Sequence, residues 1–175
     1  MSKVIWITGL SGSGKTTLAT LVTDSIKQSG SPVIMLDGDI LRECFGIKSK
    51  NNREERLEIA FTYSRLCRMI SSQGVTVVIA TIALFKEVHS WNRANLKNYY
   101  EIFIDTPIEE LIKRDPKNIY KRALSGKIKN VAGLDLEVDF PKNPDIHFKF
   151  DKKISPQDMK DQILKLYNEG INEKK

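Results

Sequence analysis

The stretch WITGLSGSGKTTLA, from Trp6 to Ala19, decides the fold of this chain. Residues 9–16 match the pattern GxxxxGK[ST], and they lie between a short apolar run and a segment with helical spacing of apolar residues. Glycines let such a loop curl so that its backbone N–H groups point inward at phosphate oxygens, and the N-terminus of the following helix adds partial positive charge. The stretch therefore predicts a phosphate-binding loop (P-loop). The alternative is a glycine turn that only connects a strand to a helix.

The P-loop predicts contacts with a nucleoside triphosphate. We expect Lys15 to reach the β- and γ-phosphates and the Thr16 hydroxyl to hold Mg²⁺. The residues expected to contact the triphosphate are Gly9, Leu10, Ser11, Gly12, Ser13, Gly14, Lys15, Thr16 and Thr17. Because switches, motors and kinases share this loop, it does not identify the second substrate.

Predicted strands alternate with predicted helices along the rest of the chain. Short β-rich runs predict strands over residues 3–8, 32–36, 75–80, 99–104 and 147–150. Helical spacing predicts helices from residue 15 to a stop at Gly30, over 53–73 and 86–97, after Pro107, and over 156–168. This order predicts an α/β fold, with a parallel sheet and helices on both of its faces.

Length and composition favour one domain over residues 1–175 that acts in the cytoplasm. Cys44 and Cys67 lie far apart and form no CxxC motif, which favours reduced thiols. The apolar run VIWI is too short for a membrane span or a signal peptide, so no membrane partner is expected. The net charge of +6 favours anionic partners. Because the basic residues form no tail, we expect phosphorylated small molecules and no nucleic acid.

An acidic segment, LDGDILR (36–42), directly follows the second predicted strand. The carboxyl ends of strands line the ligand crevice of an α/β sheet, so Asp37 and Asp39 are expected near the P-loop. A carboxylate there can accept the proton of an attacking hydroxyl or bind the water shell of a metal. Arg42 suits an anion on the acceptor. The alternative is a capped turn, since Asp-Gly pairs are common in turns.

Several segments together resemble the adenylylsulfate kinase family. They are GLSGSGKTT, LDGD..R, FIDTP (103–107), RDPKNIYKRALSGKIKN (114–130) and GLDLEVDFPKNP (133–144). The resemblance implies a P-loop kinase fold with a lid over about residues 114–145. It also implies transfer of the γ-phosphate of ATP to the ribose 3′-hydroxyl of a nucleotide conjugate, with Mg²⁺ as cofactor. A homodimer is expected because the family is commonly dimeric.

The resemblance assigns roles to residues outside the P-loop as well. Asp39 is the expected catalytic base, with Lys15 as the second catalytic residue, and Asp37 is expected to support the metal site through water. Arg114 is expected to cover the ATP nucleotide, together with the segment from Lys117 to Lys121. The residues expected to bind the acceptor are Asp37, Asp39, Arg42, Arg53, Arg56, Ile82, Lys86, Lys121 and Val131.

The chain departs from the family pattern in the expected base pocket. The family motif NFTGID, whose ring stacks on adenine, appears as NVAGLD (130–135), with Val131 in place of the ring. The motif DLGFS, which supplies the other ring, is replaced by ECFGIKSKNN (43–52), where Phe45 could substitute. The asparagine of ENIRR is replaced by Arg56, and ISPFR appears as IALFK (82–86).

These departures favour an acceptor with a base other than adenine. Stacking of a base on an aromatic ring contributes about 1–3 kcal/mol, so the loss of two rings weakens adenine binding strongly. The chain is similar to the branch of the family that phosphorylates cytidine diphosphoramidate, a precursor for phosphoramidate decoration of bacterial capsules. The alternative is an adenylylsulfate kinase whose pocket has drifted. A nucleotide-binding switch is a distant alternative, because we find neither an NKxD motif nor an acid in the third strand.

Overall fold

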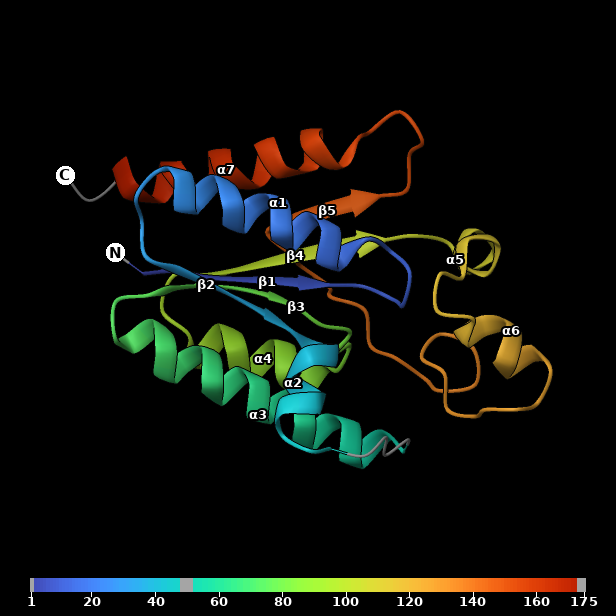
Figure 1. Ribbon diagram of the computed structural model, residues 1–175. Coiled ribbons are helices and arrows are strands. Elements are labelled where there is room, and N and C mark those ends of the chain that lie inside the picture. Colours follow the sequence, from blue (N-terminus) through green and yellow to red (C-terminus); the bar gives the residue numbers. More distant parts are fainter. Residues whose placement is uncertain (1, 48–51, 173–175) are drawn as a thin grey trace.

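The computed structural model describes residues 2–47 and 52–172, and its centre is a five-stranded sheet (Figure 1). All neighbouring strands are parallel, in the order β2-β3-β1-β4-β5. The strands are β1 (Val4–Thr8), β2 (Val33–Asp37), β3 (Thr76–Ala80), β4 (Tyr99–Asp105) and β5 (Ile146–Lys149). The sequence predicted each of these strands within one or two residues, and the α/β fold is confirmed.

Helices cover both faces of the sheet, as predicted. They are α1 (Lys15–Gln28), α2 (Gly38–Cys44), α3 (Arg53–Ser72), α4 (Lys86–Asn95), α5 (Ile108–Arg114), α6 (Ile119–Leu124) and α7 (Pro156–Asn172). In Figure 1, α1 and α7 lie on one face of the sheet, and α3 and α4 lie on the other. Within the described residues, no helix combines the length and the apolar character needed to cross a bilayer.

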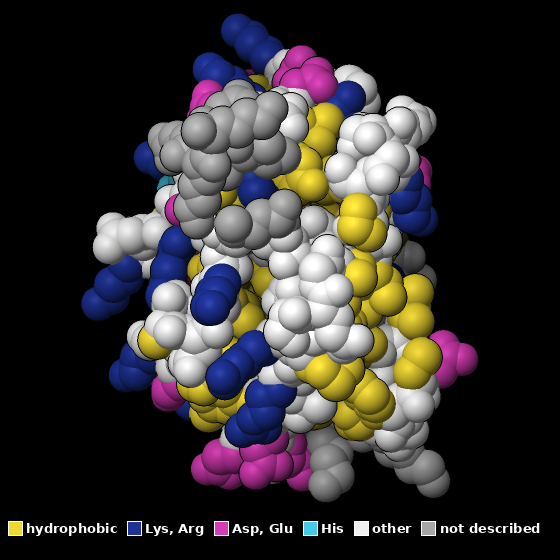
Figure 2. All heavy atoms as spheres, turned by 90° about the vertical axis from the view of Figure 1, so that its left-hand side faces the viewer, with side chains coloured by type: hydrophobic (Ala, Val, Ile, Leu, Met, Phe, Trp, Pro, Cys, Tyr) yellow, Lys and Arg dark blue, Asp and Glu magenta, His cyan; other side chains and the backbone are white. Residues whose placement is uncertain are grey.

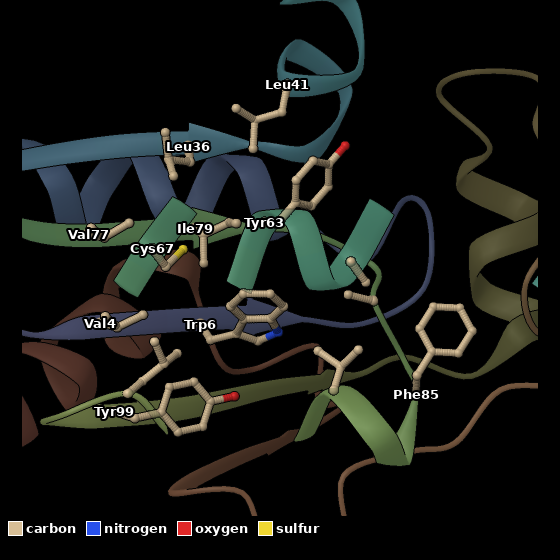
Figure 3. Close-up of a cluster of buried hydrophobic side chains, with 14 residues drawn as sticks. Val4, Trp6, Leu36, Leu41, Tyr63, Cys67, Val77, Ile79, Phe85 and Tyr99 are labelled. Carbon is tan, nitrogen blue, oxygen red and sulfur yellow. The ribbon is translucent and has the colours of Figure 1, made fainter. Parts of the chain in front are cut away.

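The central strands are apolar because both of their faces are covered. Every residue of β1 and β3 is buried. Along β1, alternate side chains serve opposite faces: Val4 and Trp6 join the cluster under α3 and α4, and Ile5 and Ile7 join the cluster under α1 and α7. Figure 3 shows the first cluster, where Trp6 lies beneath α3. Trp6 is therefore a core residue, in agreement with the packing role that its strand position favours.

Two short helices were not predicted. The segment expected as an acidic turn is the end of β2 followed by α2, and Asp37 is the N-cap of that helix, with its Oδ1 accepting a hydrogen bond from the Asp39 N–H at 2.8 Å. The second helix, α6, lies inside the segment expected as a lid. Helices of seven and six residues are too short to show a periodic apolar pattern, so the sequence gives little warning of them.

The carboxyl ends of β1, β2 and β3 bring three separate segments to the same edge of the sheet. These are the P-loop, which follows β1, the start of α2, which follows β2, and residues 81–85, which follow β3. Figure 1 shows α5, α6 and the chain that returns from them to β5 at this same end of the molecule. The fold therefore places the predicted site residues around one crevice, as expected for an open α/β sheet.

Charged side chains are mixed on the face of the molecule shown in Figure 2. Lys and Arg side chains there are interspersed with Asp, Glu and uncharged residues, and hydrophobic side chains gather along one side. This distribution agrees with the spread of basic residues along the sequence.

Candidate active site

A cavity of about 630 Å³ opens at the carboxyl ends of the central strands. It is enclosed by the P-loop, the start of α2, one side of α3, residues 80–85 and the segment 116–138. The predicted site residues that line it are Ser11, Gly12, Gly14, Lys15, Thr16, Thr17, Asp37, Asp39, Arg42, Arg56, Ile82 and Val131. Residues chosen for donor binding, metal binding, catalysis and acceptor binding therefore surround a single space.

The P-loop depends on glycine where the backbone is tight. Gly14 has φ = 97° and forms the N-cap of α1, a conformation that favours glycine. At Gly9, a Cβ atom would lie 2.5 Å from the carbonyl oxygen of Ile104 on β4. The loop is thus packed closely against the sheet, and α1 begins at its end with unpaired N–H groups that suit phosphate oxygens.

Lys15 is folded across the P-loop. Its Nζ donates a hydrogen bond to the Leu10 carbonyl oxygen at 2.7 Å. The pKa of Lys15 is lowered to about 7, chiefly by burial and also by the positive charge of Lys117, while Asp37 acts in the opposite direction. An anionic ligand in the cavity would supply the negative charge that this ammonium group lacks.

Thr16 and Asp37 place oxygen atoms side by side at the start of α1. The Thr16 Oγ1 donates to Asp37 Oδ2 at 2.7 Å. Hydroxyl and carboxylate oxygens are ligands that suit Mg²⁺, which usually combines one or two of them with phosphate oxygens and water. Within the described residues, no group of three or more His, Cys, Asp or Glu side chains could hold a metal ion. The two oxygens therefore fit a metal ion that is shared with a bound phosphate.

Asp39 connects the start of α2 to the segment 116–138, which encloses the cavity from another side. Its carboxylate forms ion pairs with Arg42, one turn further along α2, and with the Nζ of Lys117. The Asp39 side chain remains 50% exposed, so a ligand in the cavity can reach it. Lys117 was predicted only as part of a covering segment, and the ion pair brings it directly to the expected base.

Tyr63 of α3 supports the start of α2 from below. Its hydroxyl donates to the Gly38 carbonyl oxygen at 3.0 Å, and burial raises the pKa of this phenol, which keeps it a donor. Thr81 packs closely against Gly38, the first residue of α2. A Cβ atom at Gly38 would lie 3.1 Å from the Thr81 Oγ1. The sequence analysis missed both residues, because nothing in their local pattern separates them from ordinary core positions.

One wall of the cavity is mainly apolar. We call Ile82, Phe85 and Val131 the apolar wall, since all three line the cavity. Val131 is 6% exposed and Phe85 is 4% exposed. Val131 also packs in a cluster with Leu10, which follows β1. The position expected to carry a stacking ring in the family therefore carries a small, tightly packed aliphatic side chain.

The turn that carries Val131 is held by two charged side chains. The Asp135 carboxylate accepts hydrogen bonds from the backbone N–H groups of Asn130 (2.7 Å) and Val131 (2.5 Å), and these bonds lower the pKa of Asp135. Arg56 of α3 donates from Nη2 to the Asn130 carbonyl oxygen at 2.9 Å. Burial lowers the pKa of Arg56, and the nearby Arg42 adds to this effect.

Some predicted site residues do not line the cavity in the described structure. They are Gly9, Leu10, Ser13, Arg53, Lys86, Arg114 and Lys121. Gly9, Leu10 and Ser13 belong to the P-loop and lie behind its cavity-facing surface. Arg53 donates from Nη2 to Glu87 at 3.2 Å and to Asp139 at 3.0 Å, so two carboxylates hold it beside the cavity.

The remaining three cations lie on the short helices α4, α5 and α6, outside the cavity lining. Lys86 is exposed at the start of α4. Arg114 pairs with Glu110 at 3.3 Å and lies over the ring of Phe150, 5.2 Å from its centre. The backbone N–H of Lys121 donates to Asp115 at 2.8 Å, and its side chain is exposed.

Phe45 was considered as a substitute for a missing ring. It is 47% exposed at the C-terminal end of α2 and is not among the lining residues. Residues 48–51, part of the segment ECFGIKSKNN, lie outside the described residues. Two cations that the prediction did not single out, Arg122 and Lys129, do line the cavity. Both occur in the segment 114–130, whose basic character was the available signal.

Comparison with known proteins agrees with the geometry. The sequence model of the adenylylsulphate kinase family matches residues 1–149. The chain is 42% identical over 138 residues to the cytidine diphosphoramidate kinase of Campylobacter jejuni, covering 79% of this chain and 81% of that protein. It is 36% identical over 166 residues to the adenylyl-sulfate kinase of Deinococcus deserti, covering 93% and 89%.

A solved structure is similar over nearly the whole fold. It is the Mycobacterium tuberculosis APS kinase CysC in complex with AMPPNP and APS, with a TM-score of 0.87, 30% identity, and coverage of 95% of this chain and 98% of that one. The family match, the sequence relatives and the fold agree. The chain therefore belongs to the adenylylsulphate kinase family of phosphotransferases.

Proposed function

We propose that this protein transfers the γ-phosphoryl group of ATP to the ribose 3′-hydroxyl of a cytidine conjugate, with cytidine diphosphoramidate as the favoured acceptor. The observation that carries this proposal is the contrast within one cavity. Its P-loop end has the groups needed for phosphoryl transfer, whereas Val131 occupies the position from which an aromatic ring would grip adenine. The higher identity to the Campylobacter enzyme, 42% against 36% for the Deinococcus enzyme, supports it.

The donor half of the proposed reaction uses the P-loop. Its backbone N–H groups and Lys15 bind the phosphates of ATP. Arg114 of α5, which lies outside the cavity lining, would cover the nucleotide. Thr16 and Asp37 would hold Mg²⁺, which neutralises charge on the transferring phosphoryl group when it is bound. Lys117, Arg122 and Lys129 face the same space and would exclude water that could otherwise hydrolyse ATP.

The acceptor half of the proposed reaction depends on Asp39. Its carboxylate accepts the proton of the 3′-hydroxyl while that oxygen forms a bond to the γ-phosphorus and ADP leaves. Arg42 binds the phosphate side of the acceptor, and the apolar wall contacts its base. Arg53, Lys86 and Lys121 would have to change position to reach the acceptor, since none of them lines the cavity in the described structure.

A second candidate is phosphorylation of adenylylsulfate. Phe85 lines the cavity, and adenine could stack on its ring if the Arg53 guanidinium, which lies 5.3 Å from the ring centre, moved away. The Deinococcus relative and the Mycobacterium structure, an adenylyl-sulfate kinase and an APS kinase by name, also favour it.

Kinetic assays with each acceptor separately distinguish the two candidate functions. The protein is incubated with ATP and Mg²⁺, each acceptor is supplied in turn, and ADP release is followed. We expect kcat/KM for cytidine diphosphoramidate to exceed that for adenylylsulfate by about tenfold or more, the size expected from one lost stacking contact. A higher kcat/KM for adenylylsulfate would establish the second candidate. If neither acceptor stimulated ADP release, both candidate functions would be contradicted.

We also propose that the chain acts in the cytoplasm as a homodimer. Sedimentation equilibrium of the full chain tests the oligomeric state, and a mass equal to one chain across the concentration range would contradict it.

A further inference from the structure

Arg56 lies at the edge of the apolar wall. It projects from α3 and lines the cavity. Its Nη2 donates to the carbonyl oxygen of Asn130, the residue directly before Val131, at 2.9 Å. This bond places the guanidinium group next to the part of the cavity where the base of the acceptor would lie.

The guanidinium group of Arg56 is not fully satisfied. Its Nε is shielded from solvent and has no hydrogen-bond acceptor within the described part of the chain. The carboxylate that influences it, Asp135, is already bonded to the backbone N–H groups of Asn130 and Val131. A buried N–H group without an acceptor is rare in folded proteins. Because this Nε is shielded, a base in the cavity would bond to the terminal Nη1 and Nη2 groups, or to Nε after the side chain shifted.

An arginine selects for a particular pattern of atoms on a base. It carries donors only, arranged as a rigid fork that fits two acceptors side by side. Cytosine presents O2 and N3 as adjacent acceptors. Uracil has an N–H donor at N3, and adenine has its N6 amino group beside N1 and N7, so each would set a donor against the fork.

We propose that Arg56 is the residue that reads the base of the acceptor, by donating hydrogen bonds to O2 and N3 of cytosine from the edge of the apolar wall. This inference rests on the proposed function. It adds a positive selection for cytosine to the loss of adenine stacking. Guanine, which also presents two adjacent acceptors, O6 and N7, is the strongest competing occupant.

Two substitutions distinguish two roles of Arg56: hydrogen bonding to the base of the acceptor, and the bond to Asn130 that holds the turn before Val131. Arg56→Lys keeps the charge and a donor for the Asn130 oxygen but loses the fork, and Arg56→Gln loses both the charge and the fork. Arg68→Gln is the matched control, since Arg68 is exposed on the same helix and does not line the cavity. Thermal melting of each full-length variant confirms that it is folded.

The first measurement is binding, which does not depend on the reaction. Isothermal titration calorimetry of CMP, UMP, AMP and GMP is carried out on the protein with AMPPNP and Mg²⁺ present. We expect the native protein to bind CMP most tightly, by about tenfold or more over UMP, and both Arg56 variants to lose this preference. The control should retain it.

The second measurement is turnover with cytidine diphosphoramidate and its uridine counterpart. We expect the ratio of their kcat/KM values to fall by about tenfold or more in both Arg56 variants, through KM for the acceptor, while KM for ATP stays unchanged.

The inference would be overturned if the native protein showed no preference for CMP over UMP, or if it bound GMP more tightly than CMP. It would also be overturned if both Arg56 variants kept the preference for CMP, or if Arg56→Lys alone kept it in full. Selective CMP binding without turnover of the cytidine conjugate would support the reading by Arg56 and contradict the proposed function.

Discussion

The P-loop end of the cavity and its apolar wall are built in different ways. The P-loop end comes from two short segments, residues 9–17 and 37–39, each of which follows a strand of the sheet directly. Its contacts join residues close in sequence or segments at the same edge of the sheet, such as Thr16, which follows β1, to Asp37 at the end of β2, with β3 between the two strands. The apolar wall combines Ile82 and Phe85, which follow β3, with Val131, and Arg56 of α3 lies at its edge. It is held by bonds between distant residues, such as Arg56 to Asn130.

This difference separates the chemistry of the site from its selectivity. Groups that act on phosphate need a fixed backbone, and the sheet supplies it. The residues proposed to contact the base lie in the loop after β3 and in the segment 130–138, which is held by apolar packing with Leu10 and by polar contacts such as Arg56 to Asn130 and Arg53 to Asp139. Substitutions in the wall can therefore change the acceptor without disturbing phosphoryl transfer. The predictions below test that separation, from the largest expected effect to the smallest.

The strongest test is Asp39→Asn, which should affect chemistry alone. We expect kcat to fall by about 10²–10⁴-fold, because a positioned acid–base group contributes that much. AMPPNP binding should be retained, since Asp39 lies outside the P-loop. Steady-state kinetics and calorimetry measure the two effects, and Asp161→Asn on α7, whose carboxylate is 64% exposed, is the control. An unchanged kcat would remove Asp39 from the role of base.

The pH dependence of ATP binding tests the P-loop end. The pKa of Lys15 is lowered to about 7, and bound phosphates should raise it toward the ordinary value of about 10.4. Binding then takes up a proton above pH 7. Affinity for AMPPNP should therefore fall as the pH rises from about 7 to 9, by at most about tenfold per pH unit. Calorimetry in buffers of different ionisation enthalpy counts the protons.

Lys15→Met provides the control for this measurement, because it removes the titrating group. The variant should bind AMPPNP more weakly and without proton uptake of this kind. If the affinity of the native protein for AMPPNP did not change between about pH 7 and 9, Lys15 would already be charged before the nucleotide binds.

Val131→Phe tests the wall. A ring at this position should improve kcat/KM for adenylylsulfate relative to cytidine diphosphoramidate by about five- to a hundredfold, the value of one stacked base. Because Val131 is buried, the larger side chain can also strain its neighbours, so the melting temperature is measured alongside. Leu134→Phe, in the same turn but outside the cavity lining, is the control. An equal response in both variants would contradict the stacking argument.

Asp135→Asn should have the smallest effect. The amide keeps an acceptor for the Asn130 and Val131 N–H groups but loses the charge that strengthens those bonds. We expect KM for the acceptor to rise by roughly threefold, with kcat unchanged, because the wall loosens and the P-loop end does not.

The pH profile of this variant is also constrained. Backbone N–H groups hold the pKa of Asp135 below its ordinary value, so the ionised carboxylate stops stabilising the turn only at acidic pH. The rise in KM caused by Asp135→Asn should therefore be constant between about pH 6 and 8. Asp158→Asn is the control, since Asp158 caps the backbone N–H of Ser155 at the far helix α7. A comparable rise in KM in that control would indicate a general loss of stability.

Local patterns were sufficient for the sheet and the P-loop end. The five strands, the P-loop and the position of Asp37 and Asp39 all follow from short runs of residues, since a strand and the loop after it are adjacent in sequence. The same reasoning failed for α2 and α6, which are too short to show a period. It also could not find Tyr63 or Thr81, which reach the site from elements that look like ordinary core.

The charged residues show most clearly what sequence cannot decide. Family resemblance grouped Arg42, Arg53 and Lys86 as acceptor contacts. In the fold Arg42 lines the cavity, Arg53 is held by Glu87 and Asp139, and Lys86 is exposed. The direction and partner of a long side chain depend on which carboxylates the fold brings near it, and those lie 34 and 86 residues away in the case of Arg53.

The amino-acid sequence by itself determined the parallel α/β fold and the P-loop, because each depends on contiguous residues with a fixed backbone geometry, and its resemblance to one family over several segments indicated a kinase. Only the tertiary structure decided how the acceptor side is arranged. There Lys117 meets Asp39, Arg56 reaches the turn before Val131, and Phe45 lies away from the cavity. The physical reason is that selectivity arises from contacts between residues far apart in the chain, and the folded sheet sets the distances between them.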